Sequence, residues 1–249
     1  MKINIYIATH KEYVFPKDSC YIPIQVGAAI YPALPYVGDH TGQNISEKNK
    51  NYCELTALYW VWKNAKADFI GLCHYRRYFK GKKGIATEKE IEHRLSRTNT
   101  VLPKKRHYLI ETNYSQYIHA HHAEDLELTR RIILKKYPEY IDAWEKIMTK
   151  TKGHRFNMLI MKQEVLNNYC EWLFDILFEL EKQLDISAYS DYDSRVFGFV
   201  AERLLDIWLE KERISYSEMA VYETEHVNWV KKIGAFLWRK VEYYIKRKK

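Results

Sequence analysis

A histidine, a tyrosine and two arginines directly follow an apolar run, and this is the part of the sequence best suited to chemistry. Residues 68–73 have the composition of a strand buried on both faces, and His74, Tyr75, Arg76 and Arg77 come next. Such a strand must end before these charges, so we expect the four side chains at its carboxyl end, where open α/β sheets bind ligands. Guanidinium groups offer paired planar donors that suit phosphate oxygens. The segment therefore predicts a site for an anionic ligand.

A second polar turn follows the first expected strand, residues 2–8, and consists of Thr9, His10 and Lys11. In a doubly wound sheet this turn lies at the same edge as the arginine pair. Lys11 and nearby backbone N–H groups would hold a phosphate or a uracil ring. An exposed turn without function is the simpler interpretation of this segment alone. Together with the arginines, binding is favoured.

A glycine-containing loop, residues 38–43, leads into a helix expected from 44 to about 64. Helix N-termini favour anions through their free N–H groups, which makes Asn44, Lys48 and Asn49 donor-binding candidates. The GxxxxGK[ST] spacing of a phosphate-binding loop is absent. An ordinary helix cap explains the spacing equally well.

Three histidines and two carboxylates gather in residues 119–125, which contain His119, His121, His122, Glu124 and Asp125. The spacing matches no standard metal-ligand set, so a metal site is the lesser alternative. Asp125 is a candidate general base, because a sugar acceptor hydroxyl needs a carboxylate close by. Helix capping on a solvated face is the competing interpretation.

A DxD-like pair, Asp191 and Asp193, precedes a helix expected over 194–212. Many sugar transferases hold a divalent metal with such a motif at a strand end. Here the position before a helix favours capping. Within the helix, Arg195 is a candidate for the acceptor side. Glu202 either pairs with an arginine or faces the pocket as a second candidate base.

The 249 residues alternate strands and helices, which predicts an α/β fold with a mostly parallel central sheet flanked by helices, in one domain over residues 1–229. Further along the chain we expect a strand at 156–161 and a helix at 164–184, whereas 80–100 reads as a loop with one short helix. The four cysteines show no metal spacing, and neither a secretory signal nor a membrane span is recognisable. A reducing, cytoplasmic location follows as an expectation.

The last twenty residues, 230–249, hold eight basic side chains and one acidic one, so the rest of the chain is nearly neutral. This distribution argues against a nucleic-acid partner, which would favour a basic face on the folded body. The apolar stripe of the segment predicts an amphipathic helix on an anionic membrane surface, although packing on the domain with a solvated basic end is the alternative. The membrane-facing candidates are Lys231, Lys232, Phe236, Trp238, Arg239 and Lys240.

Several of these segments also share one family pattern. They are residues 5–11, 23–27, 44–49, 52–60, 71–78, 121–122, 156–158 and 195–204. Together they resemble a bacterial family, long known as a domain of unknown function, whose members are described as capsular or exopolysaccharide glycosyltransferases. The resemblance extends to about residue 225 and does not include the basic tail.

The resemblance implies a GT-A-like nucleotide-sugar fold in which residues 74–77 occupy the usual place of the DxD motif. Some relatives are similar to galactofuranosyltransferases, which suggests UDP-galactofuranose as the donor. Asp193 departs from the family, which has glutamine there, and this weakens a metal role for the Asp191 and Asp193 pair.

We therefore expect a glycosyltransferase without a metal cofactor, with Mn²⁺ or Mg²⁺ as the alternative. Arg76, Arg77 and Lys11 would neutralise the diphosphate, and His121 and His122 would line the acceptor side. The acceptor would be a glycan on a polyprenyl diphosphate at the inner face of the cell membrane. Two other functions stay open: a metal-dependent hydrolase built on residues 119–125, and a non-catalytic glycan-binding scaffold that uses the many aromatic residues.

Overall fold

In the computed structural model, which describes residues 1–108 and 110–225, strand β1 (Ile3–Thr9) forms the centre of the sheet. Its isoleucines pack into one hydrophobic cluster, while Tyr6 and Ala8 pack into a second cluster on the opposite face. β1 pairs in parallel with both β2 (Tyr21–Gln25) and β4 (Phe69–His74). A strand buried on both faces needs this near-continuous apolar sequence.

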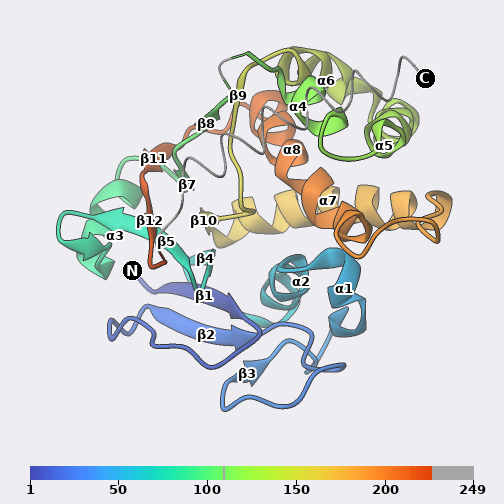
Figure 1. Cartoon of the computed structure of the whole chain (residues 1–249). Helices are drawn as coiled ribbons and strands as arrows, with labels where there is room; N and C mark the ends of the chain where they lie inside the picture. Colours follow the sequence, from blue (N-terminus) through green and yellow to red (C-terminus); the bar gives the residue numbers. More distant parts are fainter. Residues whose placement is uncertain (109, 226–249) are drawn as a thin grey trace.

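The other elements follow the alternation expected of an α/β chain (Figure 1). The remaining strands are β3 (Val37–Gly38), β5 (Arg77–Gly81), β6 (Gly84–Ile85), β7 (Thr100–Pro103), β8 (Arg106–His107), β9 (Lys152–Gly153), β10 (Leu159–Lys162), β11 (Ser217–Met219) and β12 (Val221–Glu223). The α-helices are α1 (Asn49–Tyr52), α2 (Leu55–Asn64), α3 (Glu88–Leu95), α4 (Asn113–Ile118), α5 (Ala123–Lys136), α6 (Ile141–Met148), α7 (Gln163–Gln183) and α8 (Val196–Lys211). Short 3₁₀ turns are η1 (Ser46–Lys48), η2 (Pro138–Tyr140) and η3 (Asp193–Arg195).

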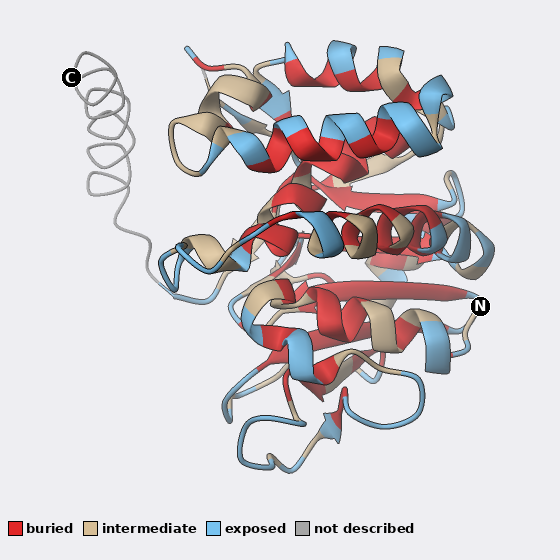
Figure 2. Cartoon of the chain, turned by 90° about the vertical axis from the view of Figure 1, so that its right-hand side faces the viewer, coloured by how far each residue is buried: buried red, intermediate tan, exposed pale blue. Residues whose placement is uncertain are grey.

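The main path of the described sheet runs β11-β7-β10-β4-β1-β2-β3. Four of its six neighbour pairs are parallel, and β10 runs antiparallel to both of its neighbours. Helices α2, α7 and α8 pack on one face, with α5 and α6 outside them, and α3 packs on the other. Figure 2 shows the buried residues of these helices turned inward and the exposed ones outward. The predicted α/β fold with a mostly parallel sheet flanked by helices is confirmed.

Three local predictions were wrong. The helix expected from 44 to 64 is broken at Cys53, which has a φ of 52° and separates α1 from α2. The strand expected at 156–161 begins only at Leu159, because Phe156 and Asn157 have φ values of 77° and 50°. The segment read as a loop contains β5 and β6, and β5 pairs with β12 more than 140 residues further along the chain. Local sequence pattern carries no signal for a pairing of such long range.

Across the part of the chain that the structure describes, every helix is too short or too polar to traverse a lipid bilayer. The predicted amphipathic helix 230–249, with the membrane-facing candidates Lys231, Lys232, Phe236, Trp238, Arg239 and Lys240, lies outside the described residues.

Candidate functional site

The carboxyl ends of β1 and β4 lie side by side, because Ala8 is the register partner of His74. The turns after both strands therefore meet at one edge of the sheet. Thr9 shapes the first turn, since its hydroxyl donates to the Lys11 carbonyl at 2.7 Å and accepts from the Lys11 N–H at 3.3 Å. Thr9 is buried and acts on the turn itself, so the structure gives it no direct contact with a donor.

Three basic side chains surround the ring of Tyr75 at this edge. Lys11 Nζ lies 5.1 Å from the ring centroid and the Arg76 guanidinium 5.0 Å, while the His10 ring packs edge-on at 5.2 Å. Burial, with the charges of Lys11, Arg76 and Arg195, lowers the pKa of His10. Arg195 thus belongs to the same positive field although it comes from η3. We call His10, Lys11, Tyr75, Arg76 and Arg195 the cationic cluster.

The arginine pair does not converge on one spot as predicted. Arg76 faces the cationic cluster, whereas the Arg77 guanidinium lies 4.5 Å from the ring of Phe156. His74 also turns toward this residue, with its Nε2 2.5 Å from the Phe156 carbonyl oxygen. Arg76 lies in the two-residue turn between β4 and β5, whereas Arg77 begins β5 and is the register partner of His74, and this separates the neighbouring arginines.

Both arginines are paired with glutamates from the end of the described chain. Arg76 Nη1 lies 3.2 Å from Glu225 Oε2, and Arg77 Nε lies 3.6 Å from Glu223 Oε1. Glu223 is the last residue of β12, which lies antiparallel to β5, and Glu225 follows the strand. The Thr224 N–H donates to the Arg76 carbonyl at 3.1 Å. An anionic ligand on Arg76 would compete with the Glu225 carboxylate.

Strained backbone gathers next to the cationic cluster. Cys53, Phe156 and Asn157 all have positive φ values, and Arg195 Nε donates to Cys53 Sγ at 3.1 Å. Asn157 Nδ2 donates to Glu54 Oε1 at 2.7 Å and to the Gly198 carbonyl at 3.1 Å. Such residues persist where their surroundings over-determine them, and they are common at functional sites. The sequence shows apolar spacing here and no sign of strain.

Glu202 anchors this strained loop to α8. Its Oε1 accepts from the Phe156 N–H at 2.8 Å, and its Oε2 accepts from Arg203 Nη1 at 2.9 Å, with Arg155 Nε 3.9 Å away. Both arginines are buried. Of the two interpretations of Glu202, pairing with an arginine fits the structure, because each of its oxygens is engaged by a buried donor.

Asp125, the other predicted base, does not line this edge. Its side chain is buried at 1% exposure, and its two oxygens accept from the hydroxyls of Tyr117 and Tyr189, each at 2.7 Å. Burial raises its pKa despite these two hydrogen bonds. A substrate hydroxyl has no route to such a carboxylate, so the structure contradicts the prediction of a catalytic role.

The histidines of residues 119–125 do not converge on one point, although His122 Nε2 also lies 3.9 Å from Asp193, the partner of His121. His119 Nδ1 lies 2.5 Å from Glu111, His121 pairs with Asp193 at 3.2 Å, and the His122 ring stacks on Tyr189 at 4.0 Å. Among the described residues, no three His, Cys, Asp or Glu side chains are grouped as metal ligands would be. The arrangement therefore does not favour a metal hydrolase built on this segment.

His121 lies closer to the site than its neighbours do. Its ring stacks on Phe199 at 4.2 Å and on Tyr192 at 5.7 Å, and the Arg195 guanidinium lies 5.6 Å from the Phe199 ring. Burial lowers the pKa of His121 to about 4, with the charge of Arg203 adding to the effect. A neutral imidazole among aromatic rings forms a largely apolar surface that can also form hydrogen bonds. Sugars contact surfaces of this kind.

The loop before α1 is built mostly for structure. Asn44 donates to the carbonyls of His40 and Gly42, and Asn49 donates to the Cys53 carbonyl and to Thr56 Oγ1. Both amides are thus committed within the loop and helix. Lys48 pairs with Glu181 of α7 at 2.6 Å. The structure does not support Asn44, Lys48 or Asn49 as donor contacts.

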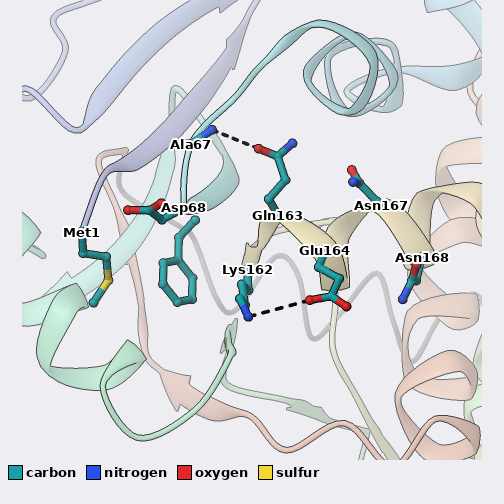
Figure 3. Close-up of a pocket in the computed structure, with 9 residues that line it drawn as sticks. Met1, Ala67, Asp68, Lys162, Gln163, Glu164, Asn167 and Asn168 are labelled. Carbon is teal, nitrogen blue, oxygen red and sulfur yellow. Dashed lines mark hydrogen bonds and ion pairs between the residues drawn. The ribbon is translucent and has the colours of Figure 1, made fainter.

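A groove of about 630 Å³ lies at the opposite, amino-terminal edge of the parallel strands. Figure 3 shows Asp68, which precedes β4, beside Gln163 and Lys162 at the start of α7. The Ala67 N–H donates to Gln163 Oε1 at 3.0 Å, and Lys162 pairs with Glu164 at 3.7 Å. The hollow is lined by paired groups and lies apart from the cationic cluster.

The fold and this edge define an α/β protein with a cationic ligand site at the carboxyl ends of its parallel strands. The chain belongs to the family described as a domain of unknown function (DUF4422), whose profile matches residues 4–213. Comparison with curated proteins found no significant match. A solved structure described as the apo form of WbbM, a bifunctional glycosyltransferase, is similar with a TM-score of 0.82 and 30% sequence identity. The match covers 90% of this chain and 46% of that one, so this chain spans less than half of WbbM's length.

Proposed function

We propose that the protein is a glycosyltransferase that takes a sugar from a UDP-sugar donor. The observation that carries the proposal is the cationic cluster at the carboxyl edge of the sheet, in a fold similar to that of a glycosyltransferase. Lys11, Arg76 and Arg195 supply positive charge from three different elements. A nucleoside diphosphate is an anion of matching charge and size.

The cluster would act on the leaving group. As the bond between sugar and diphosphate breaks, negative charge grows on the phosphate oxygens, and fixed cations at that point stabilise the transition state. Arg76 can also form paired hydrogen bonds to phosphate. These side chains would do the work that a divalent metal does in other transferases, so we propose turnover without a metal.

The finer assignments rest on the resemblance and on the tail. We propose galactofuranose as the sugar and a polyprenyl-diphosphate glycan of capsule or exopolysaccharide synthesis as the acceptor. His121, Phe199 and Arg195 would line the acceptor side. The basic segment 230–249 would hold the enzyme on the cytoplasmic face of an anionic membrane.

Thermal unfolding with and without nucleotides tests the proposal. UDP, UDP-galactose and UDP-galactofuranose should each raise Tm, because a ligand that binds only the native state stabilises it by mass action. At about 100 times Kd the rise is about 5–10 °C for a chain of this size. The rise should survive EDTA. No shift with any of the three would contradict the proposal, and a shift that needs Mn²⁺ would reject its metal-free form.

A further inference from the structure

We propose that Glu54 is the general base that takes the proton from the acceptor hydroxyl. The inference rests on the proposed function and names the one catalytic group that neither Asp125 nor Glu202 supplies. Glu54 is the N-cap residue immediately before helix α2 and directly follows the strained Cys53.

The other fixed carboxylates near the site are already engaged. Asp125 is bound by two tyrosine hydroxyls, and Glu202 by Arg203 and a backbone N–H. Asp193 accepts from Ser190 Oγ at 2.8 Å through one oxygen and lies 3.2 Å from His121 through the other. Each oxygen of these three carboxylates already has a polar partner, so taking up a proton would disturb an existing interaction.

Glu54 is fixed through one oxygen and open at the other. Its Oε1 accepts from Asn157 Nδ2 at 2.7 Å, and within the described chain no hydrogen bond or ion pair involves its Oε2. The side chain is half-buried, so the free oxygen is both oriented and reachable. Glu12 also lies near this edge and is unbonded among the described residues, but it is exposed and nothing there orients it.

Glu54 lies two contacts from the arginine pair. The Arg77 guanidinium packs on the Phe156 ring, and the next residue, Asn157, donates to Glu54. Arg195 lies on the other side of Glu54. Burial lowers the pKa of its guanidinium, but the nearby Cys53 and Glu54 outweigh this effect and raise the pKa. Arg195 also acts on His10, so the member of the cationic cluster that interacts with Glu54 interacts with His10 as well.

The backbone holds the carboxylate in place from both sides. Cys53 and Asn157, which flank and orient Glu54, have φ values of 52° and 50°. Each such residue costs about 1–3 kcal/mol, and strain of this kind is kept where it orients a reacting group. Asn157 is therefore a positioning residue for Glu54.

The step is a direct displacement. The acceptor O–H proton moves to the free Glu54 oxygen while the acceptor oxygen attacks the anomeric carbon of the donor. A new carbon–oxygen bond forms, the bond between that carbon and the diphosphate breaks, and its electron pair leaves with UDP. In hydrolysis, water takes the acceptor's place.

Glu54→Gln tests the assignment, because glutamine keeps the oxygen that accepts from Asn157 and loses only basicity. UDP release from UDP-galactofuranose, in water and with an octyl galactoside as acceptor probe, should fall about 100-fold or more. The rise of Tm with UDP should match that of the native protein. The matched control is Glu12→Gln, which should release UDP at the native rate.

The outcomes separate the two proposals. If native protein and Glu54→Gln release UDP equally, Glu54 is not the base and the glycosyltransferase proposal stands. If Glu54→Gln loses the UDP-dependent rise of Tm together with turnover, Glu54 supports the site structurally and the base assignment is wrong. If the native protein releases no UDP from this donor with either acceptor, the proposed function fails, and the base assignment with it.

Discussion

The two edges of the parallel sheet handle polar groups in opposite ways. At the amino-terminal edge, the groove of Figure 3 is lined by groups that satisfy one another, such as Gln163 with the Ala67 N–H and Lys162 with Glu164. At the carboxyl edge, Lys11 and Arg76 gather around one tyrosine ring. The groove thus lies at one edge and the cluster of basic side chains at the other.

The backbone is also strained at the carboxyl edge and not at the groove of the other edge. Cys53, Phe156 and Asn157, three of the four non-glycine residues with positive φ in the described chain, lie at the carboxyl edge, and none lines the groove at the other. Strain of about 1–3 kcal/mol per residue persists only where a network enforces it. Basic side chains and strained backbone thus occur together at the carboxyl edge, where we propose the site.

Removing one cation from each edge should test the difference between the two edges most directly. Arg76→Ala should weaken UDP binding about 10- to 100-fold, because a charge-assisted hydrogen bond contributes about 1.5–3 kcal/mol. Lys162→Ala, at the groove, should leave UDP affinity unchanged. Isothermal titration of UDP into each variant measures both. Equal losses in the two variants would show that general charge, and not the cationic cluster, attracts the nucleotide.

Much of this contrast was predictable from the sequence. The apolar run ending at Cys73 required a buried strand, and its polar continuation required an exposed edge. The parallel pairing of β1 with β4 then brings Lys11 near Arg76. These are local patterns combined with one topological rule, which is why the fold class and this edge could be found without coordinates.

The carboxylates could not be assigned in the same way. From the sequence, Asp125 is an acid at the start of a helix, yet one of its oxygens accepts a hydrogen bond from Tyr189, 64 residues away. Glu54 reads as one residue within a continuous helix, and only the break at Cys53 and the long-range contact with Asn157 make it distinctive. Burial and hydrogen bonding between distant segments decide which acid is free, and neither is encoded in spacing.

The pH dependence of the free energy of unfolding is a second test of the difference between the two edges, because a histidine is buried on the carboxyl side. The folded-state pKa of His121 is about 4 and its unfolded value 6.5, so the unfolded chain binds more protons between these pH values. Stability should therefore fall by about 3 kcal/mol as pH drops from 6.5 to 4. Urea unfolding at pH 7, 5.5 and 4 measures the loss.

His121→Phe should remove most of this dependence, whereas His122→Gln, at an exposed histidine, should keep it. Phenylalanine preserves the stacking on Phe199 and loses the contact with Asp193, which changes the stability at pH 7 but not the slope. An unchanged slope in His121→Phe would assign the titration to another group.

The smallest expected effect concerns the glutamates that pair with the arginines at the carboxyl edge. Glu225→Gln should raise the affinity for pyrophosphate two- to fivefold, because the ligand no longer competes with a carboxylate 3.2 Å from Arg76. Both partners are more than 40% exposed, which limits the gain to about 1 kcal/mol or less. Glu164→Gln removes the acid paired with Lys162 at the other edge and should change nothing. A loss of affinity in Glu225→Gln would mean that this glutamate orients Arg76 for the ligand instead of competing with it.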